Sequence, residues 1–353
     1  MIDHLYKENI LSLDPYTATR VSETNLLLDW NETFSCNQKL YDYLANELRS
    51  RVNLTRYPPI NTDKIKEKII GYLKSRGHLE TSNIQLFNGT DSALKCIFDC
   101  FCSKGSNVLF PIPNYDQVKT FVATNEGNLI HCNYTIEDIK NKIEDHYIDI
   151  CYISNPHNPT GTVLNDNRLT ELITDNPKTL FIIDEAYIEF TEHIQSSIDF
   201  IMDGDYDNVI VARTFSKMFG LAGVRLGYLV APKKIIDYLN KIRNIKEVNT
   251  VALLAAEYLL DNPEFIEEQK ELIDTCKMKL YSVFEKYSIP YIKSQTNFIY
   301  IELFGDKEIY RFKECLRTKN IVIRDKGEYL RMTVGTNFTT VLIIQAIENE
   351  YGK

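Results

Sequence analysis

The first two thirds of the chain contain short, uninterrupted apolar runs that alternate with amphipathic stretches. The run Leu180-Phe181-Ile182-Ile183 is apolar along its whole length. Strands buried on both faces have this pattern, and they occur mostly in parallel sheets covered by helices. Strands are predicted at residues 107–111, 148–154, 180–184, 209–213 and 227–231, with helices between them, for example at 91–103 and 165–174. This alternation indicates α/β architecture with a mostly parallel central sheet flanked by helices.

The pattern changes after about residue 232. A long helical region over residues 232–287 is followed by strand-like segments and by a final helix from about Thr339. Segregated helices and strands are typical of a smaller α+β domain. The expected strands lie at residues 297–303, 321–324 and 329–334. We therefore expect an N-terminal arm over residues 1–35 that packs with the small domain or covers a cleft, a large domain over residues 36–245, and the small domain over residues 246–353.

Composition and charge narrow the class of protein. The 353 residues are 44% hydrophobic and 25% charged, as in ordinary soluble globular proteins. The net charge of −9 argues against a general nucleic-acid or anionic-membrane binder. The N-terminal segment lacks the apolar run of a secretory signal, and no stretch approaches the roughly 18 consecutive apolar residues of a membrane span. We expect a cytoplasmic protein with neither nucleic-acid nor membrane partners.

Eight cysteines are scattered along the chain without paired C-x-x-C sets. Cys96, Cys100 and Cys102 fall on one predicted helix, but no histidine stands at ligand spacing beside them. Buried small apolar side chains in a reducing compartment explain this pattern better than a metal site does. We therefore expect no metal centre.

Polar segments follow several predicted strands, at the edge of an α/β sheet where ligands bind. The first, Gly89-Thr90-Asp91, opens a helix whose free amides would form an anion site; taken alone, ordinary capping by Thr90 or Asp91 is the commoner reason for such a turn. The second is the run N-P-H-N-P-T-G from residue 155 to 161. Its prolines and glycine make it rigid, and its asparagines offer neutral hydrogen bonds. His157 by itself fits a loop residue better than a catalyst.

Two further segments carry charges among apolar neighbours. Asp184 ends an apolar strand, where a carboxylate is costly unless a cation pairs with it, and a structural ion pair is one explanation. Lys217 lies in a loop with hydroxyls, glycines and Arg225, groups that suit a phosphate. Lys217 is either a surface charge or a desolvated amine, whose lowered pKa would let it act as a nucleophile.

The ordered motifs N-P-x-N-P-T-G, D-E-A-Y and T-x-S-K-x-x-G-L-A-G-x-R resemble those of fold-type I pyridoxal-phosphate enzymes, and of the histidinol-phosphate aminotransferase family in particular. The resemblance runs through most of the chain, from Asp14-Pro15-Tyr16 to residues 330–336. It implies an aminotransferase with pyridoxal 5'-phosphate as its cofactor, and a large cofactor domain beside a smaller α+β domain. These motifs are much less specific for the substrate than for the fold and the cofactor.

The resemblance also implies catalytic roles. Lys217 would bond covalently to the cofactor and later move the α-proton of the substrate. Asp184 would keep a proton on the pyridine nitrogen, and that cation would offset its buried charge. Asn158 and Tyr187 would hydrogen-bond the phenolic oxygen of the ring, and Tyr115 would stack on the ring.

The family likeness places the cofactor phosphate among donors from three segments. These are the amides of Gly89, Thr90 and Asp91 and the side chains of Thr214, Ser216 and Arg225. Tyr57 matches the position that, in the family, reaches the phosphate of the neighbouring subunit. A homodimer with shared active sites is therefore implied.

The implied substrates are a small phosphorylated amino compound and a 2-oxo acid, with glutamate and 2-oxoglutarate as the usual pair of the family. Arg331 matches the position that binds an anionic substrate group, which a bidentate guanidinium suits. Arg324 and Tyr16 match contacts to a distal phosphate, although Arg324 alone would also fit a surface ion pair. Trp30 and Asn31 fall close to the substrate.

Three departures from the family pattern fall in or near the substrate pocket. Trp30, the only tryptophan, replaces a small residue, while Val118 and Lys246 each replace an aromatic one. We hypothesise that the substrate is smaller or more polar than histidinol phosphate, such as a serinol-phosphate-like three-carbon compound. A divergent histidinol-phosphate enzyme with a repacked pocket is the alternative.

Two other classes of protein compete with an aminotransferase. A decarboxylase of serine or threonine phosphate would use the same cofactor residues, because the reaction depends on which substrate bond lies perpendicular to the ring. A transcription regulator with this fold would need an added basic DNA-binding domain, which we do not expect in an acidic chain that begins almost at the catalytic fold.

Overall fold

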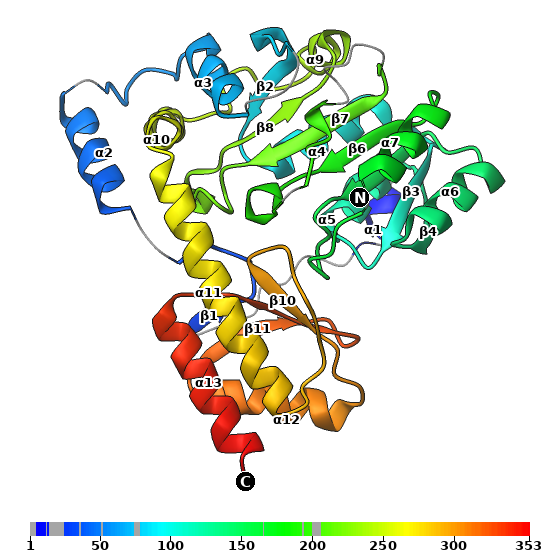
Figure 1. Cartoon of the computed structure of the whole chain (residues 1–353). Coiled ribbons are helices and arrows are strands. Elements are labelled where there is room, and N and C mark those ends of the chain that lie inside the picture. The colour runs from blue at the N-terminus through cyan, green and yellow to red at the C-terminus, as the bar shows by residue number, and fades with distance from the viewer. Residues whose placement is uncertain are drawn as a thin grey trace.

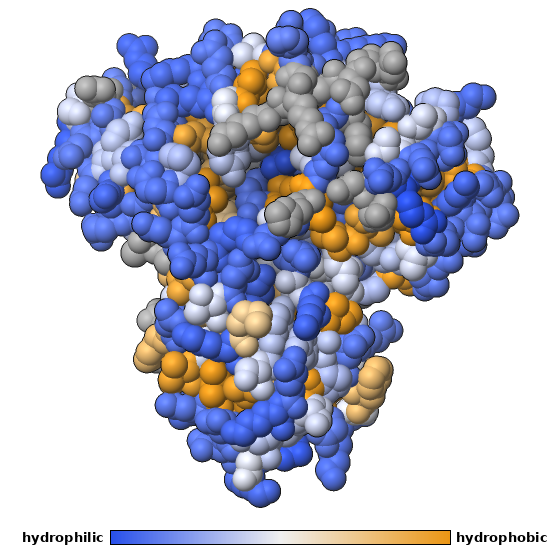
Figure 2. Space-filling view, viewed as in Figure 1, coloured by the Kyte–Doolittle hydropathy of each residue, from blue (hydrophilic) through white to orange (hydrophobic). Residues whose placement is uncertain are grey.

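Two sheets with their helices make up the computed structural model of the chain (Figure 1). The structure describes residues 5–11, 13, 25–34, 37–50, 52–73, 78–164, 166–192, 194–199 and 206–353. A seven-stranded sheet forms the larger part of the molecule, and a five-stranded sheet forms the smaller part. The face seen in Figure 2 is mostly hydrophilic, with apolar side chains gathered in separate patches.

The larger sheet is mostly parallel, with the strand order β2-β8-β7-β6-β5-β3-β4. Strand β8 runs antiparallel to β2 and β7, whereas the other pairings are parallel. The strands are β2 (Ile84–Phe87), β3 (Asn107–Ile112), β4 (Asn128–Asn133), β5 (Ile150–Ser154), β6 (Leu180–Asp184), β7 (Val209–Thr214) and β8 (Gly227–Val230). Asp184 is paired with Ser154 on one side and Ala212 on the other, so the carboxyl ends of β5 and β6 are level and β7 extends to Thr214 beyond them. The segments that follow these strands therefore meet at one edge of the sheet.

Helices cover both faces of this sheet. In β6, Ile182 belongs to one apolar core together with residues of α4, and Ile183 belongs to a second core with residues of α6 and α7. Successive side chains of a strand point to opposite faces, so burial on both faces explains the continuous apolar run. The helices of this part are α2 (Gln38–Ser50), α3 (Asp63–Leu73), α4 (Thr90–Phe101), α5 (Gln117–Thr124), α6 (Ile136–Asp145), α7 (Asp166–Asp175), α9 (Lys233–Leu239) and α10 (Thr250–Asp261), with 3-10 turns at Thr81–Asn83, Ile188–Phe190 and Ala222–Val224.

The smaller sheet has the strand order β1-β11-β12-β10-β9. Strand β1 pairs with β11 in parallel, and the other pairings are antiparallel. Its strands are β1 (Leu26–Leu28), β9 (Tyr291–Ile292), β10 (Phe298–Ile301), β11 (Ile321–Asp325) and β12 (Leu330–Thr333), and its helices are α11 (Glu264–Lys286), α12 (Asp306–Arg317) and α13 (Asn337–Tyr351). Figure 1 shows α11 running from the larger part of the molecule along the smaller sheet.

The predicted architecture is confirmed: a large, mostly parallel sheet flanked by helices lies beside a smaller α+β part. The structure adds β4, which the apolar pattern misses because all of its residues are at least partly exposed at the sheet edge. The helical region predicted over residues 232–287 is divided into α9, α10 and α11. The Asn249 side chain caps the start of α10, and Pro263 directly precedes α11.

The N-terminal segment contacts both parts of the molecule. Strand β1 extends the smaller sheet, whereas α1 (Glu8–Leu11) lies against α5 of the larger part. Helix α10, which the sequence assigns to the small domain, lies against α2 and α3. The division after residues 35 and 245 therefore stays a prediction. Among the helices that the structure describes, none has the length and apolarity needed to cross a membrane.

Candidate active site

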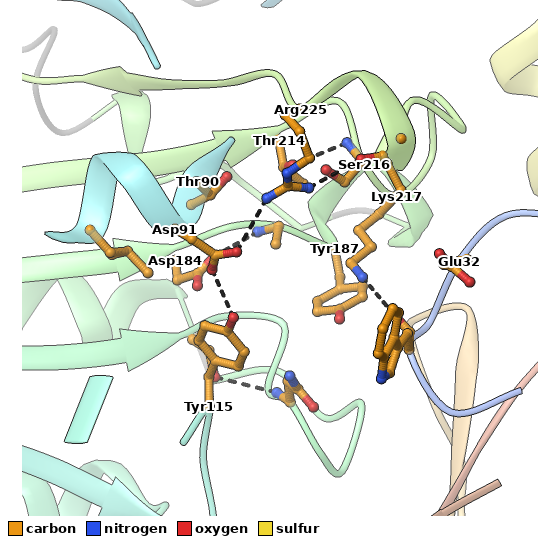
Figure 3. A pocket seen from close by; sticks show the side chains of 17 residues that line it. Glu32, Thr90, Asp91, Tyr115, Asp184, Tyr187, Thr214, Ser216, Lys217 and Arg225 are labelled. Atoms are coloured by element: carbon orange, nitrogen blue, oxygen red, sulfur yellow. Dashed lines mark hydrogen bonds and ion pairs between the residues drawn. The ribbon is translucent and has the colours of Figure 1, made fainter. Parts of the chain in front are cut away.

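A cavity of about 480 Å³ opens at the carboxyl ends of the parallel strands, where the sequence motifs converge (Figure 3). Strands β5, β6 and β7 and the segments that follow them supply most of its wall. The lining residues are Trp30, Glu32, Thr90, Asp91, Leu94, Tyr115, Ser154, Asn158, Asp184, Ala186, Tyr187, Thr214, Ser216, Lys217, Ala222, Gly223 and Arg225. Most of the predicted cofactor-binding residues thus lie around one space.

Lys217 follows β7 and reaches into this cavity. Its neighbours Phe215 and Met218 are fully buried and anchor the loop from which the lysine extends. The Lys217 Nζ atom donates a hydrogen bond of 2.8 Å to the backbone oxygen of Trp30 and lies 5.7 Å from the centre of the Tyr187 ring. The partly buried amine therefore lines the cavity, with its ammonium close to an aromatic ring.

Asp184, the last residue of β6, presents a buried carboxylate to the same cavity. The Tyr152 hydroxyl donates to Oδ2 at 2.6 Å, and the Ala186 amide donates to Oδ1 at 3.1 Å. Within the described part of the chain, these hydrogen-bond donors are both neutral. Burial raises the pKa of Asp184 to about 6. This carboxylate therefore fits a ligand that brings a cationic nitrogen into the cavity.

The structural ion pair at the end of β6 belongs to Glu185 instead. Arg213 Nε lies 2.8 Å from Glu185 Oε2, and Arg213 NH1 lies 2.9 Å from Glu189 Oε1. The Ser197 amide donates to Glu185 Oε1 at 2.6 Å. The protein therefore compensates the buried charge of Glu185 by itself. The ion pair that the sequence allows for Asp184 is formed by its neighbour Glu185.

Backbone amides and an arginine form a candidate phosphate site beside Asp184. The first residue of α4 follows Gly89, and in the described structure no side chain caps this helix, so the capping explanation is wrong. Gly89 has φ +80°, and a Cβ atom there would lie 2.6 Å from Arg225 NH2. Arg225 NH2 also pairs with Asp91 Oδ2 at 3.2 Å. The uncapped helix start, its glycine and the guanidinium together form a cradle for an anion.

Hydroxyls add to this cradle from β7 and from the loop that follows it. Thr214 and Ser216 line the cavity, and the Thr214 Oγ1 atom accepts a hydrogen bond of 3.0 Å from the Ser216 amide. The Thr90 hydroxyl donates to the Arg213 carbonyl at 3.0 Å. A Cβ atom at Gly227 would lie 2.6 Å from the Thr90 amide, so only glycine allows this close approach of β8 to α4.

Aromatic and amide side chains surround the space between Asp184 and Lys217. Tyr115 donates its hydroxyl to Asp91 Oδ1 at 2.7 Å, and Figure 3 shows Asp91 between Tyr115 and Arg225. The Tyr187 hydroxyl accepts from Asn31 Nδ2 at 2.9 Å. Asn158 lines the same space. An aromatic ring with a polar substituent would find a stacking surface and hydrogen-bond partners here.

His157 is turned away from the cavity, as its sequence context suggests. It is buried and stacks on Tyr134, with the ring centres 3.5 Å apart. Its Nε2 lies 2.7 Å from the Pro113 carbonyl oxygen, and its Nδ1 lies 2.7 Å from Thr160 Oγ1. Burial lowers the pKa of His157 to about 4. A neutral His157 thus ties the loop that carries Asn158 to the loop that precedes Tyr115.

A second cavity of about 340 Å³ shares six lining residues with the first: Trp30, Asp91, Tyr115, Asn158, Tyr187 and Lys217. Its further lining includes the predicted substrate residues Asn31, Arg324 and Arg331, together with Asn114, Asp116, Gln117, Lys326 and Tyr329. The sequence missed Asp116 and Lys326, because their approach depends on how the two parts of the molecule meet. Tyr16 lies outside the described residues.

Arg331 lines the second cavity and contacts Asn158, which lines both. Its NH1 donates to Asn158 Oδ1 at 2.5 Å, and its NH2 donates to the Asp29 carbonyl at 2.7 Å. Both acceptors are neutral, and the buried Nε has no partner among the described residues. Burial also lowers the pKa of this guanidinium. Tyr57, by contrast, is 76% exposed and is absent from the described lining of both cavities.

Comparisons with known proteins show the family of the chain. Residues 28–348 match the family described as aminotransferase class I and II. A dihydroxyacetone phosphate transaminase of Campylobacter jejuni is 29% identical, over 98% of this chain and 97% of that protein. A histidinol-phosphate aminotransferase of Caldicellulosiruptor saccharolyticus is 31% identical, over 84% of each chain.

The fold agrees as well. The structure of a histidinol-phosphate aminotransferase from Sinorhizobium meliloti, in complex with pyridoxal-5'-phosphate, has a TM-score of 0.88 at 21% identity and covers 98% of this chain and 97% of that chain. The match of the family model over most of the chain shows the family. The chain therefore belongs to the class I and II aminotransferases, which depend on pyridoxal phosphate.

Proposed function

We propose that this aminotransferase transfers an amino group between a small phosphorylated three-carbon compound and a 2-oxo acid, with glutamate and 2-oxoglutarate as the donor pair. The observation that carries the proposal is the second cavity, where Trp30 and three cationic side chains, Arg324, Lys326 and Arg331, lie next to Lys217. The large indole limits the length of the substrate, and the cations suit its phosphate. The relative from Campylobacter jejuni, named for dihydroxyacetone phosphate, supports this choice.

The residues of the first cavity fit the cofactor. The amides at the start of α4, with Thr214, Ser216 and Arg225, would hold its phosphate, and Tyr115 would cover one face of its ring. Asp184 would hold the proton of the ring nitrogen, and Asn158 and Tyr187 would bind the ring oxygen. When bound, pyridoxal phosphate supplies an aldehyde that joins amines and a ring that accepts electrons from the substrate carbon.

Lys217 would carry the proton in each half of the reaction. Its amine is the base that takes the proton from the substrate carbon beside the nitrogen and then returns a proton to the product. The Trp30 carbonyl and the Tyr187 ring hold this amine in place, at 2.8 Å and 5.7 Å. Arg331 would bind the carboxylate of the amino donor or the phosphate of its partner, because both anions match a guanidinium.

We further propose a homodimer with shared active sites. Tyr57 lies on a segment with the exposed apolar side chains Leu54 and Ile60, and the Lys246 ammonium lies 4.1 Å from its ring centre. A second copy that covers this segment would bring Tyr57 to its cofactor phosphate. Light scattering should give the mass of two chains, and a monomer with full cofactor affinity would contradict the proposal.

The described cysteines are free thiols, which supports a cytoplasmic location.

The substrate proposal is tested with the purified holoenzyme and glutamate. We expect efficient amino transfer to dihydroxyacetone phosphate, with kcat/KM in the roughly 10⁴–10⁸ M⁻¹s⁻¹ range of ordinary enzymes, and weak reaction with histidinol phosphate and 2-oxoglutarate. The reverse preference would contradict the proposal. Release of carbon dioxide from serine or threonine phosphate would show a decarboxylase instead.

A further inference from the structure

Like charges meet at the far end of the second cavity. Arg324 of β11 and Arg331 of β12 are direct cross-strand partners, so their side chains leave the sheet on the same face. Like charges directly opposite one another destabilise a sheet. Both side chains line the cavity, so an anion in that space would offset this cost.

Lys326 adds a third cation from the turn between these strands. Its Nζ lies 2.5 Å from Oδ2 of Asp116, the residue that precedes α5 in the larger part of the molecule. Asp116 also pairs with Lys119 at 3.0 Å, so one carboxylate faces two ammonium groups. The ion pair between Lys326 and Asp116 therefore leaves positive charge in excess.

Among the charged side chains that line this cavity, the cationic ones outnumber the anionic ones. Its charged side chains are Lys217, Arg324, Lys326, Arg331, Asp91 and Asp116. Asp91 is already paired with Arg225, at 3.2 Å. Once Lys217 has joined the cofactor, Arg324, Lys326 and Arg331 are the cationic side chains that line this space. Three guanidinium and ammonium groups around one cavity suit an anion such as a phosphate monoester.

The contact between Lys326 and Asp116 can exchange. Both side chains are partly exposed, at 37% and 45%, and such ion pairs contribute little net stability. Lysine carries its charge on a flexible stem with rotatable donors, so its ammonium can swing without movement of the strands. A phosphate held by Arg324 and Arg331 would lie in the same cavity as this ammonium.

We propose that Lys326 is a substrate-binding residue that leaves Asp116 to donate to the phosphate of the substrate, and thereby selects phosphorylated substrates over unphosphorylated ones. The inference rests on the proposed function, because it concerns the phosphate of that substrate. Asp116 holds the ammonium at the mouth of the cavity until the phosphate arrives, and Lys119 then remains as the partner of Asp116.

The test compares Lys326→Met with Lys119→Met. Both variants keep an unbranched stem and remove one ammonium from Asp116, but Lys119 is absent from the described lining of the cavity. We expect K326M to weaken the binding of glycerol 3-phosphate to the holoenzyme, measured by calorimetry, roughly 10-fold to 100-fold. The KM for the phosphorylated substrate should rise by a similar factor, while the KM for glutamate stays within about twofold. K119M keeps the Lys326 ammonium and should change all three values far less than K326M does.

Two results would overturn the inference: wild-type binding of glycerol 3-phosphate by K326M, or an equal loss in both variants, which would assign the effect to Asp116 alone. Failure of the proposed function is visible separately, in the wild type. If the wild type prefers histidinol phosphate, the three-carbon substrate is wrong, and the same comparison with histidinol phosphate still decides whether Lys326 binds the phosphate.

Discussion

The amine of Lys217 donates a hydrogen bond of 2.8 Å to the backbone oxygen of Trp30. The two residues come from different sheets, since Lys217 follows β7 and Trp30 follows β1. Because the acceptor is a backbone atom, substitution of the indole leaves this hydrogen bond possible. The size of the Trp30 side chain can therefore be changed separately from the position of the Lys217 amine.

Replacement of Trp30 by Ala should broaden the substrate range. Removal of the indole enlarges the space next to Arg331, so the kcat/KM ratio of histidinol phosphate to dihydroxyacetone phosphate should rise roughly 10-fold to 100-fold. Steady-state kinetics with both substrates measure this ratio. Trp30→Phe is the matched control and should give a smaller change, whereas an unaltered ratio in Trp30→Ala would show that the ring does not limit substrate size.

Asp184 should make the cofactor-free protein less stable as the pH rises. Burial raises its pKa from 3.8 to about 6 in the folded state, so the folded protein binds this proton more tightly than the unfolded chain does. Its favourable contribution is full below pH 3.8 and is lost as the pH rises through 6. The free energy of unfolding should therefore fall by about 2 kcal/mol from this group between pH 4 and pH 8.

Asp184→Asn isolates this effect. Urea unfolding of the cofactor-free proteins should show that the free energy of unfolding of the variant rises relative to that of the wild type as the pH rises from 4 to 8. Pyridoxal phosphate should then stabilise the wild type more than the variant, because only the carboxylate pairs with the ring cation. Parallel stability curves for the two cofactor-free proteins would contradict the buried, unpaired state of this carboxylate.

The buried His157 should make the free energy of unfolding depend on pH in the opposite direction. Burial lowers its pKa from 6.5 to about 4, so the unfolded chain binds this proton more tightly. Its contribution is full above pH 6.5 and is lost as the pH falls towards 4, by about 3 kcal/mol in all. His157→Gln should be less stable than the wild type at pH 7, and the gap should narrow by pH 5. A gap that stays constant in urea unfolding would rule out a neutral, buried His157.

The sequence predicts most of the residues that line the first cavity, because each lies in a local motif beside a strand end. Asp184 ends an apolar strand and Lys217 lies in the loop after the next one, and neighbouring parallel strands bring such residues to one edge. The sequence could not tell which acid at the end of β6 forms an ion pair. Asp184 and Glu185 are adjacent, and only the fold shows that Arg213 reaches Glu185.

Other parts of the site depend on contacts between distant segments. Tyr152 reaches Asp184 because β5 and β6 pair in register, which its place in an apolar strand does not reveal. Lys326 meets Asp116 across the two parts of the molecule. Neither contact leaves a periodic or motif signal in the sequence, so the structure was needed to find them.

The covalent bond at Lys217 is the central claim, and peptide mass spectrometry tests it most directly. The protein is loaded with pyridoxal phosphate, treated with borohydride to fix any bond between the cofactor and an amine, and then digested. We expect the cofactor mass on the peptide that contains Lys217, its loss in Lys217→Ala, and its retention in the control Lys246→Ala. A wild-type Lys217 peptide without the added mass, or the mass on another lysine, would contradict the account.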